Sequence, residues 1–189
     1  MNGQASAMRP RSGQKRNLGY KLLDWLAIAV ISLGLAALLL FGIFCPLSVN
    51  DTGVGGFEDG DLVFADRFSK YIVGFERGDA VILKHTAVGG SASGRRLVRA
   101  IAFQGEKVVI ADGKVYIDGA LLDESAYTYD MYSAIREEFI VPTGSVFVLP
   151  DDRMMVSKDT IPDLIVELPE ILGKVRFIAY PFARFQAFK

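Results

Sequence analysis

The sequence is poor in the side chains that build disulfides and metal sites. Its 189 residues include one cysteine, Cys45, and one histidine, His85. A single cysteine excludes an intrachain disulfide. We expect no metal ion and no cofactor.

The chain also lacks an excess of charge. Its formal net charge is -1, which argues against a general nucleic-acid-binding protein. The distribution is nevertheless uneven. Residues 1–21 carry five lysines and arginines and no acid, whereas residues 46–189 carry 16 basic and 21 acidic side chains.

Charge is absent from Leu26–Phe44, a run of 19 residues. As a helix this run would span roughly 28 Å, close to the thickness of one hydrocarbon core. A cleaved signal peptide would have a shorter apolar region and a small-x-small cleavage site, whereas this run ends in Phe-Cys-Pro. The sequence therefore predicts a cytoplasmic basic tail over 1–21, a single membrane-spanning helix over 22–45 and an extracytoplasmic domain over 46–189.

The remainder of the chain has the pattern of a mainly β domain. Pro46–Gly56 and the glycine-rich His85–Gly94 are predicted loops, and Tyr127–Glu138 is the one stretch that could be a helix of any length. Asp112-Gly113 predicts a tight hairpin turn. Short runs of apolar and β-branched residues predict strands at 62–65, 80–83, 97–103, 107–110, 114–117, 145–149 and 175–180.

Several of these segments resemble known motifs in order and spacing. They are Gly60-Asp61-Leu-Val-Phe64, Leu97-Val-Arg-Ala-Ile-Ala-Phe-Gln-Gly-Glu106, Val115-Tyr-Ile-Asp-Gly119, Val141-Pro-Thr-Gly-Ser-Val-Phe-Val-Leu-Pro-Asp-Asp-Arg153 and Gly173-Lys-Val-Arg-Phe-Ile-Ala-Tyr-Pro-Phe-Ala-Arg-Phe185. Together with the N-terminal anchor, they resemble the type I signal peptidase family over roughly residues 49–189. The resemblance implies a signal-peptidase-like β domain on a single transmembrane helix.

The resemblance fails where catalysis would require it. The family's first motif, S-M-x-P-T-L-x-x-G-D, ends here in Gly60-Asp61, and counting back places Thr52, or Asp51 after a one-residue shift, at the serine. Both residues also suit an ordinary turn. The family's second motif, K-R-V-I-G-L-P-G-D, matches from Arg99 onward, and its lysine falls on Val98.

Supporting residues are largely retained. By resemblance they are Gly60, Asp61, Arg99, Gly105, Asp151, Arg153, Ser157 and Asp159. We expect Arg153 to form a bidentate ion pair with Asp151 or Asp159, which would tie this loop to the core.

A valine cannot accept the proton of a nucleophile, and a guanidinium does not deprotonate in proteins. We therefore expect no catalytic residues. The resemblance to non-cleaving relatives in pilus gene clusters of Gram-positive bacteria implies an accessory protein or chaperone that binds extended segments of pilins or sortase. The alternative is an active signal peptidase that cleaves preproteins with Thr52 as nucleophile. A third possibility is an anchored β domain with an unrelated scaffolding role.

Overall fold

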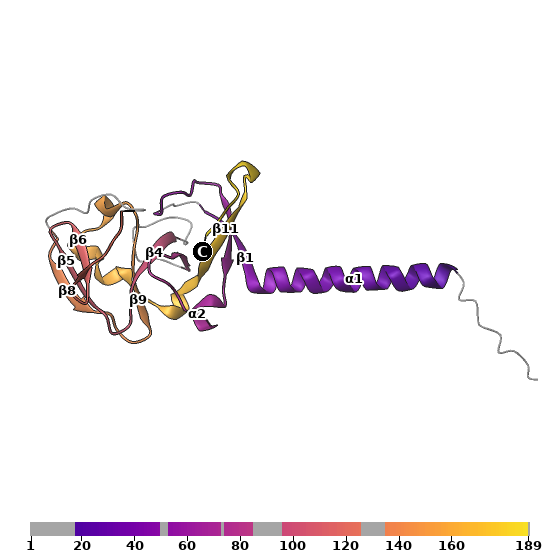
Figure 1. The fold of residues 1–189 in the computed structure, drawn as a ribbon, viewed down its shortest axis with the longest axis horizontal. Coiled ribbons are helices and arrows are strands. Elements are labelled where there is room, and N and C mark those ends of the chain that lie inside the picture. Colours follow the sequence, from indigo (N-terminus) through magenta and orange to yellow (C-terminus); the bar gives the residue numbers. More distant parts are fainter. Residues whose placement is uncertain (1–17, 50–52, 73, 85–95, 126–134, 189) are drawn as a thin grey trace, which may run out of the picture. The chain divides into compact units, whose positions relative to one another are not determined.

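The computed structural model describes residues 18–49, 53–72, 74–84, 96–125 and 135–188. The predicted basic tail lies almost wholly outside these residues, as do His85–Gly94 and most of Tyr127–Glu138. Within them the chain forms one long N-terminal helix and a mainly β domain (Figure 1). It divides into two compact units, Met1–Leu39 and Leu40–Lys189.

The first unit is built around α1 (Leu18–Ile43), whose last four residues belong to the second unit. Gly19–Leu38 within it is long and apolar enough to cross a membrane, with a mean hydropathy of 1.9. The helix begins four residues before the start of the predicted span 22–45 and ends two residues before its predicted end. Pro46 accounts for the early end, because proline lacks an N–H and disfavours helical geometry in the residue before it.

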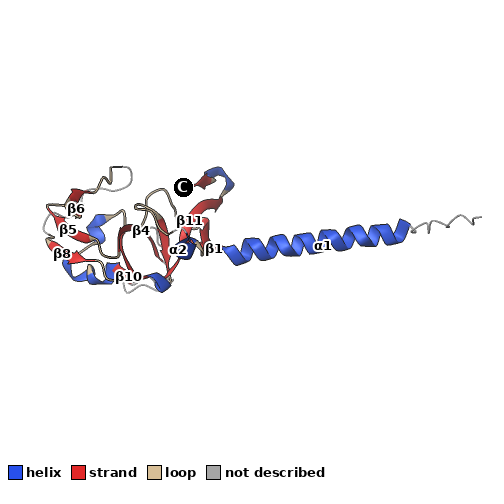
Figure 2. Cartoon of the chain, turned by 60° about the horizontal axis from the view of Figure 1, so that its bottom comes forward, coloured by secondary structure: helices blue, strands red, loops and turns tan. Residues whose placement is uncertain are grey.

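Two antiparallel sheets form the second unit (Figure 2). The larger one has the strand order β1-β2-β11-β3-β4-β9-β10, with β12 paired to β11. The smaller one has the order β7-β6-β5-β8. Strand bounds in the larger sheet are β1 Phe44–Ser48, β2 Leu62–Asp66, β3 Ala80–Leu83, β4 Arg96–Phe103, β9 Ser145–Leu149, β10 Ile165–Glu167, β11 Ile171–Tyr180 and β12 Gln186–Ala187. Those in the smaller sheet are β5 Lys107–Ala111, β6 Lys114–Ile117, β7 Ala120–Leu121 and β8 Glu137–Ile140.

Short helices occupy the connections. One is α-helical, α2 (Ser69–Ile72), and the others are single 3-10 turns. These are η1 (Arg153–Met155), η2 (Lys158–Thr160), η3 (Pro162–Leu164), η4 (Leu168–Glu170) and η5 (Phe182–Arg184).

Alternation along β3 and β4 gives the larger sheet a buried core on each face. Val81 and Val98 belong to the cluster that also contains Val108 and Ile110 of the smaller sheet. Ile82 and Leu97 point to the opposite face, where they join the cluster that includes Leu47 of β1. Both strands consequently bury apolar side chains on both faces of the sheet.

The mainly β prediction is confirmed, and the predicted strand at 80–83 matches β3. Asp112 and Gly113 have φ values of 52° and 75°, as a type I′ hairpin turn requires. Two local predictions were wrong. Residues 46–48 of the predicted loop Pro46–Gly56 belong to β1, which pairs with β2, and Glu137 and Glu138 of the predicted helix begin β8.

Asp66 closes the turn between β2 and α2. Burial by itself raises the pKa of this carboxyl, but hydrogen bonds from the Ser69 hydroxyl and from the backbone N–H groups of Phe68 and Ser69, with Arg176 nearby, hold the pKa below its ordinary value of 3.8. Because the pKa is lower in the folded than in the unfolded protein, the carboxylate stabilises the fold above pH 3.8, and this contribution is lost as the pH falls through the folded-state pKa.

We therefore expect Asp66→Asn to lower the free energy of unfolding by about 1 kcal/mol at pH 7. The difference from wild type should narrow below pH 3.8. Urea unfolding of the full chain in detergent at several pH values measures it. Asp59→Asn, at an exposed turn position, is the control. A difference for Asp66→Asn that stays constant from pH 7 to below pH 3.8 would contradict this account.

Candidate functional site

The loop that follows the nucleophile position packs tightly against the central strands. Asp51 and Thr52 themselves lie outside the described residues. Gly53, the next residue, is buried, and a Cβ added to it would lie 2.8 Å from the carbonyl oxygen of Leu97 and 3.2 Å from Cβ of Pro150. The backbone N–H of Asp151 donates to the carbonyl of Gly53 at 2.5 Å. Only a residue without a side chain fits this approach.

Val98, at the position predicted for the family's lysine, lies within the larger sheet. Its side chain is 0% exposed. The Cα of Val98 is paired with that of Val81, and Val81 is paired in turn with Lys174 of β11. Directly paired residues place their side chains on the same face of a sheet, so these three form a row across β4, β3 and β11. Val98 and Val81 belong to one apolar core cluster, so the predicted lysine position is part of the core.

Asp151 connects the loop after the nucleophile position to β4. Its Oδ1 accepts from Nε of Arg99 at 2.7 Å, and its Oδ2 accepts from a terminal nitrogen of Arg99 at 3.0 Å. Oδ2 also accepts from the backbone N–H of Gly55 at 2.7 Å. Arg99 further donates to the carbonyl of Gly78 at 2.9 Å. One carboxylate thus holds the loop, the strand and the turn before β3 together.

The expectation that Arg153 makes this bidentate contact was wrong. Arg153 is 1% exposed and pairs with Glu124. Burial raises the pKa of Glu124, Arg153 opposes that rise, and the nearby negative charge of Asp151 adds to it. The assignment failed because sequence spacing identifies the charged residues of a motif but not the direction in which β4 presents Arg99.

The other predicted supporting residues have separate, local roles. Gly60 and Gly105 occupy turns with positive φ, and Asp61 is buried, with hydrogen bonds from Glu58 N–H and Arg184. Ser157 and Asp159 are exposed and belong to the short turn around η2, where Ser157 N–H donates to Oγ1 of Thr160 at 2.9 Å. Their described contacts stay within that turn or its neighbours.

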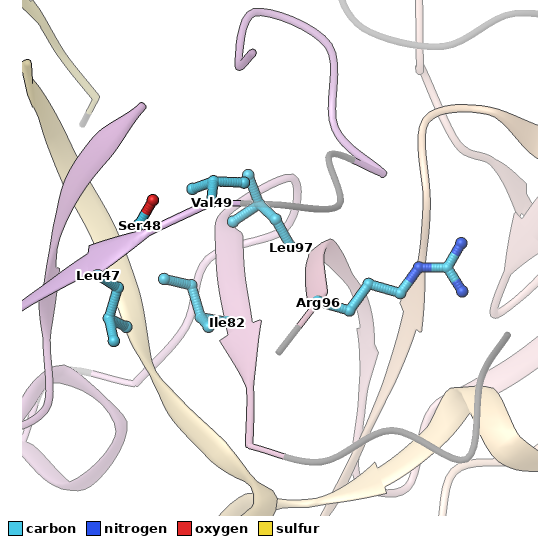
Figure 3. Close-up of a pocket in the computed structure, with 6 residues that line it drawn as sticks. All are labelled: Leu47, Ser48, Val49, Ile82, Arg96 and Leu97. Carbon is cyan, nitrogen blue, oxygen red and sulfur yellow. The ribbon is translucent and has the colours of Figure 1, made fainter. Parts of the chain in front are cut away.

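A small cavity lies beside the strand that leads to the nucleophile position. Figure 3 shows its lining residues, which are Leu47, Ser48, Val49, Ile82, Arg96 and Leu97. Its volume is about 10 Å³. That is room for about one water molecule and not for a peptide side chain.

Sequence reasoning missed one buried ion pair on the face of the sheet that carries Val98. Nζ of Lys174 lies 2.7 Å from Oδ1 of Asp79, and both side chains are 6% exposed. Asp79 also accepts from the backbone N–H of Glu76 at 2.7 Å. The available signals were the Gly78-Asp79 turn and a lysine inside an apolar strand. Among the described residues, no group of three or more His, Cys, Asp and Glu side chains is placed to hold a metal ion.

Comparison with known proteins agrees with the motif pattern. The family described as signal peptidase, peptidase S26, matches residues 22–180. Signal peptidase I of Bacillus licheniformis is 27% identical over 91% of this chain and 94% of its own length. Signal peptidase IB of Staphylococcus aureus is 25% identical over 88% of this chain and 93% of its own length.

Among solved structures, the chain is similar to a signal peptidase I from Enterococcus faecalis V583. The two are 22% identical, with a TM-score of 0.41, over 53% of this chain and 95% of the other. Since the family match alone spans most of the sequence, this chain belongs to the signal peptidase family, peptidase S26.

Proposed function

We propose that this protein is a non-cleaving member of the signal peptidase family. The observation that carries the proposal is the fully buried Val98 in the position of the lysine base. A hydroxyl nucleophile needs a neighbouring group that accepts its proton. Valine has no such group, and the adjacent Arg99 is held by Asp151 and keeps its proton in proteins.

The proposed role is binding. The N-terminal helix anchors the protein in the cell membrane, with the basic residues before it in the cytoplasm and residues 46–189 outside. There the domain holds extended segments of exported proteins, and pilin subunits or a sortase are the proposed partners in pilus assembly. The retained framework around Asp151 supports this role, because it keeps the domain ordered after loss of the base.

The names of the matched relatives favour a second candidate, an active signal peptidase that cleaves preproteins with Thr52 as nucleophile. It needs a base other than the missing lysine. Lys174 lies on the same sheet face as Val98, but its ammonium is held by Asp79 at 2.7 Å, and both side chains are 6% exposed.

A preprotein cleavage assay separates the two candidates. We expect no cleavage by the purified full-length protein in detergent, with a preprotein from the same organism as substrate and an active signal peptidase as control. A missing member of a nucleophile–base pair costs several orders of magnitude in rate, which is easily resolved. Cleavage by the wild type that disappears in Thr52→Ala would overturn the proposal and establish the second candidate.

A further inference from the structure

A groove on the second unit is remote in sequence from the positions predicted for the nucleophile and its base. It has a volume of about 460 Å³, compared with about 10 Å³ for the cavity beside β1. A volume of this size is typical of ligand sites. Its lining combines an apolar floor with a charged rim, formed by Glu137, Phe139, Lys158, Asp159, Ile161, Pro162 and Ile165.

Two sheet edges border this groove. β8 is the last strand of the smaller sheet, and β10 is the last strand of the larger one. Phe139 of β8 reaches across to Phe147 of β9, with the ring centroids 5.0 Å apart in an edge-to-face arrangement. The side-chain face of β8 that carries Phe139 therefore forms one wall of the groove, and Ile165 at the start of β10 lies in its lining.

The hydrogen-bond pattern between β5 and β8 shows which backbone groups of β8 do not pair with β5. Val141 N–H donates to the carbonyl of Glu106 at 3.0 Å, in register with the pairing of Phe139 to Val108 and of Glu137 to Ile110. Hydrogen-bonded and non-hydrogen-bonded pairs alternate in an antiparallel ladder. The backbone N–H and C=O groups of Glu138 and Ile140 consequently point away from β5, toward the edge that has no strand partner among the described residues.

Charge around the groove has one predominant sign. The four bordering elements, β8, η2, η3 and β10, carry one lysine, Lys158, and five acidic residues, which are Glu137, Glu138, Asp159, Asp163 and Glu167. Lys158 pairs with Glu137 at 2.8 Å, and Lys107 of β5 pairs with Glu138 at 2.6 Å. The other three acidic residues leave the rim with a net negative charge. Such a rim favours a partner with basic side chains.

We propose that the groove binds an extended peptide segment that adds as a strand to this outer edge of β8. Alternate apolar side chains of the peptide enter the groove against Phe139 and Ile165, and basic flanking residues meet the acidic rim. Main-chain hydrogen bonds supply affinity in this mode, and the pocket selects alternate side chains. The site does not depend on whether the chain cleaves preproteins.

The test uses the full chain in lipid nanodiscs and a fluorescein-labelled peptide in which valine alternates with threonine between flanking lysines. Fluorescence anisotropy measures its binding. We expect Glu138→Pro, which removes an outward N–H without loss of a ladder bond, to weaken binding about tenfold. Asp159→Lys, at an exposed rim position, should weaken it by a factor that shrinks as salt is added.

Two matched variants serve as controls. Glu138→Ala keeps the N–H and removes only the side chain. Leu121→Pro places proline on β7, at the opposite edge of the same sheet. There Leu122 N–H donates to the carbonyl of Val115, so by alternation the N–H of Leu121 points away from β6 and its loss breaks no ladder bond. Both should retain affinity within about threefold, since neither removes an N–H of the β8 edge.

Three results would overturn the proposal. One is binding no stronger than to empty nanodiscs. Another is an equal loss of affinity in Glu138→Pro and Leu121→Pro. The last is a Glu138→Pro variant that binds the peptide as wild type does but no longer self-associates, which would assign the edge to a second copy of the chain. The preprotein cleavage assay is unaffected by any of them, so the two proposals fail separately.

Discussion

Replacement of Asp79 by asparagine is expected to lower the free energy of unfolding by about 3–5 kcal/mol. The carboxylate of Asp79 pairs with the ammonium of Lys174 at 2.7 Å, and both side chains are 6% exposed. Asparagine can still accept from the N–H of Glu76, so the local turn is kept. What the variant removes is the negative charge, which leaves the lysine ammonium buried beside a neutral amide.

The pair as a whole contributes less than this loss suggests. Desolvation of two charges offsets much of their attraction. The loss of stability after a single replacement therefore arises mainly from the buried charge that is left without its partner. We therefore expect the double variant Asp79→Asn with Lys174→Met to be more stable than Asp79→Asn alone. The difference between the effect of the double variant and the sum of the effects of Asp79→Asn and Lys174→Met measures the coupling energy of the two side chains.

Urea unfolding of the full chain in detergent, followed by the circular dichroism of the strands, provides the measurement. The exposed pair Arg136–Asp112, whose side chains are 76% and 75% exposed, supplies the control. Arg136→Ala should change the free energy of unfolding by less than about 1 kcal/mol. A loss in Asp79→Asn no larger than that in Arg136→Ala would show that the ion pair is not buried in solution.

Val98→Lys is expected to be the second strongly destabilising substitution. It should lower the free energy of unfolding by at least about 3 kcal/mol at pH 7. The position lies in the apolar core beside Val81, and its side chain is 0% exposed. An ammonium there loses its hydration. The family's lysine thus cannot simply be restored to this sheet without a change in the surrounding packing.

The same variant has a pH dependence of definite sign. Burial lowers the folded-state pKa of a lysine below its unfolded value of about 10.4. Between these two values the unfolded chain binds more protons, so stability rises with pH. We expect Val98→Lys to be closer to wild type at pH 10 than at pH 7 in urea unfolding.

Leu121→Lys, at a position 54% exposed on β7, is the control for an added lysine, and its effect should not vary with pH in this way. A Val98→Lys protein as stable as wild type at pH 7 would contradict the buried position of residue 98. If that protein also cleaved preproteins, the domain would be a peptidase scaffold that lacks only its base.

Most strands could be predicted because their patterns are local. Apolar runs of β-branched residues identify β3 and β9, and Asp112-Gly113 identifies the hairpin between β5 and β6. β1 could not be recognised, because Pro46 and Ser48 have weak strand preference and the segment is a strand only through its pairing with β2. The start of β8 likewise depends on β5.

Composition and neighbouring residues suffice to predict several features of this protein. These are an apolar helix of membrane-spanning length, a mainly β domain, the signal peptidase motif pattern and the absence of an amine at Val98. Each can be read within a short window, because helix length, strand period and residue identity are local properties.

Which charged groups meet depends on the folded domain and not on local sequence. Arg99 rather than Arg153 takes the bidentate contact with Asp151, Arg153 pairs with Glu124, and Lys174 reaches Asp79 across two paired strands. Such partners are brought together by strand order and register, which long-range pairing sets. A charged side chain in a sequence has many possible partners, and burial within a particular sheet leaves it few.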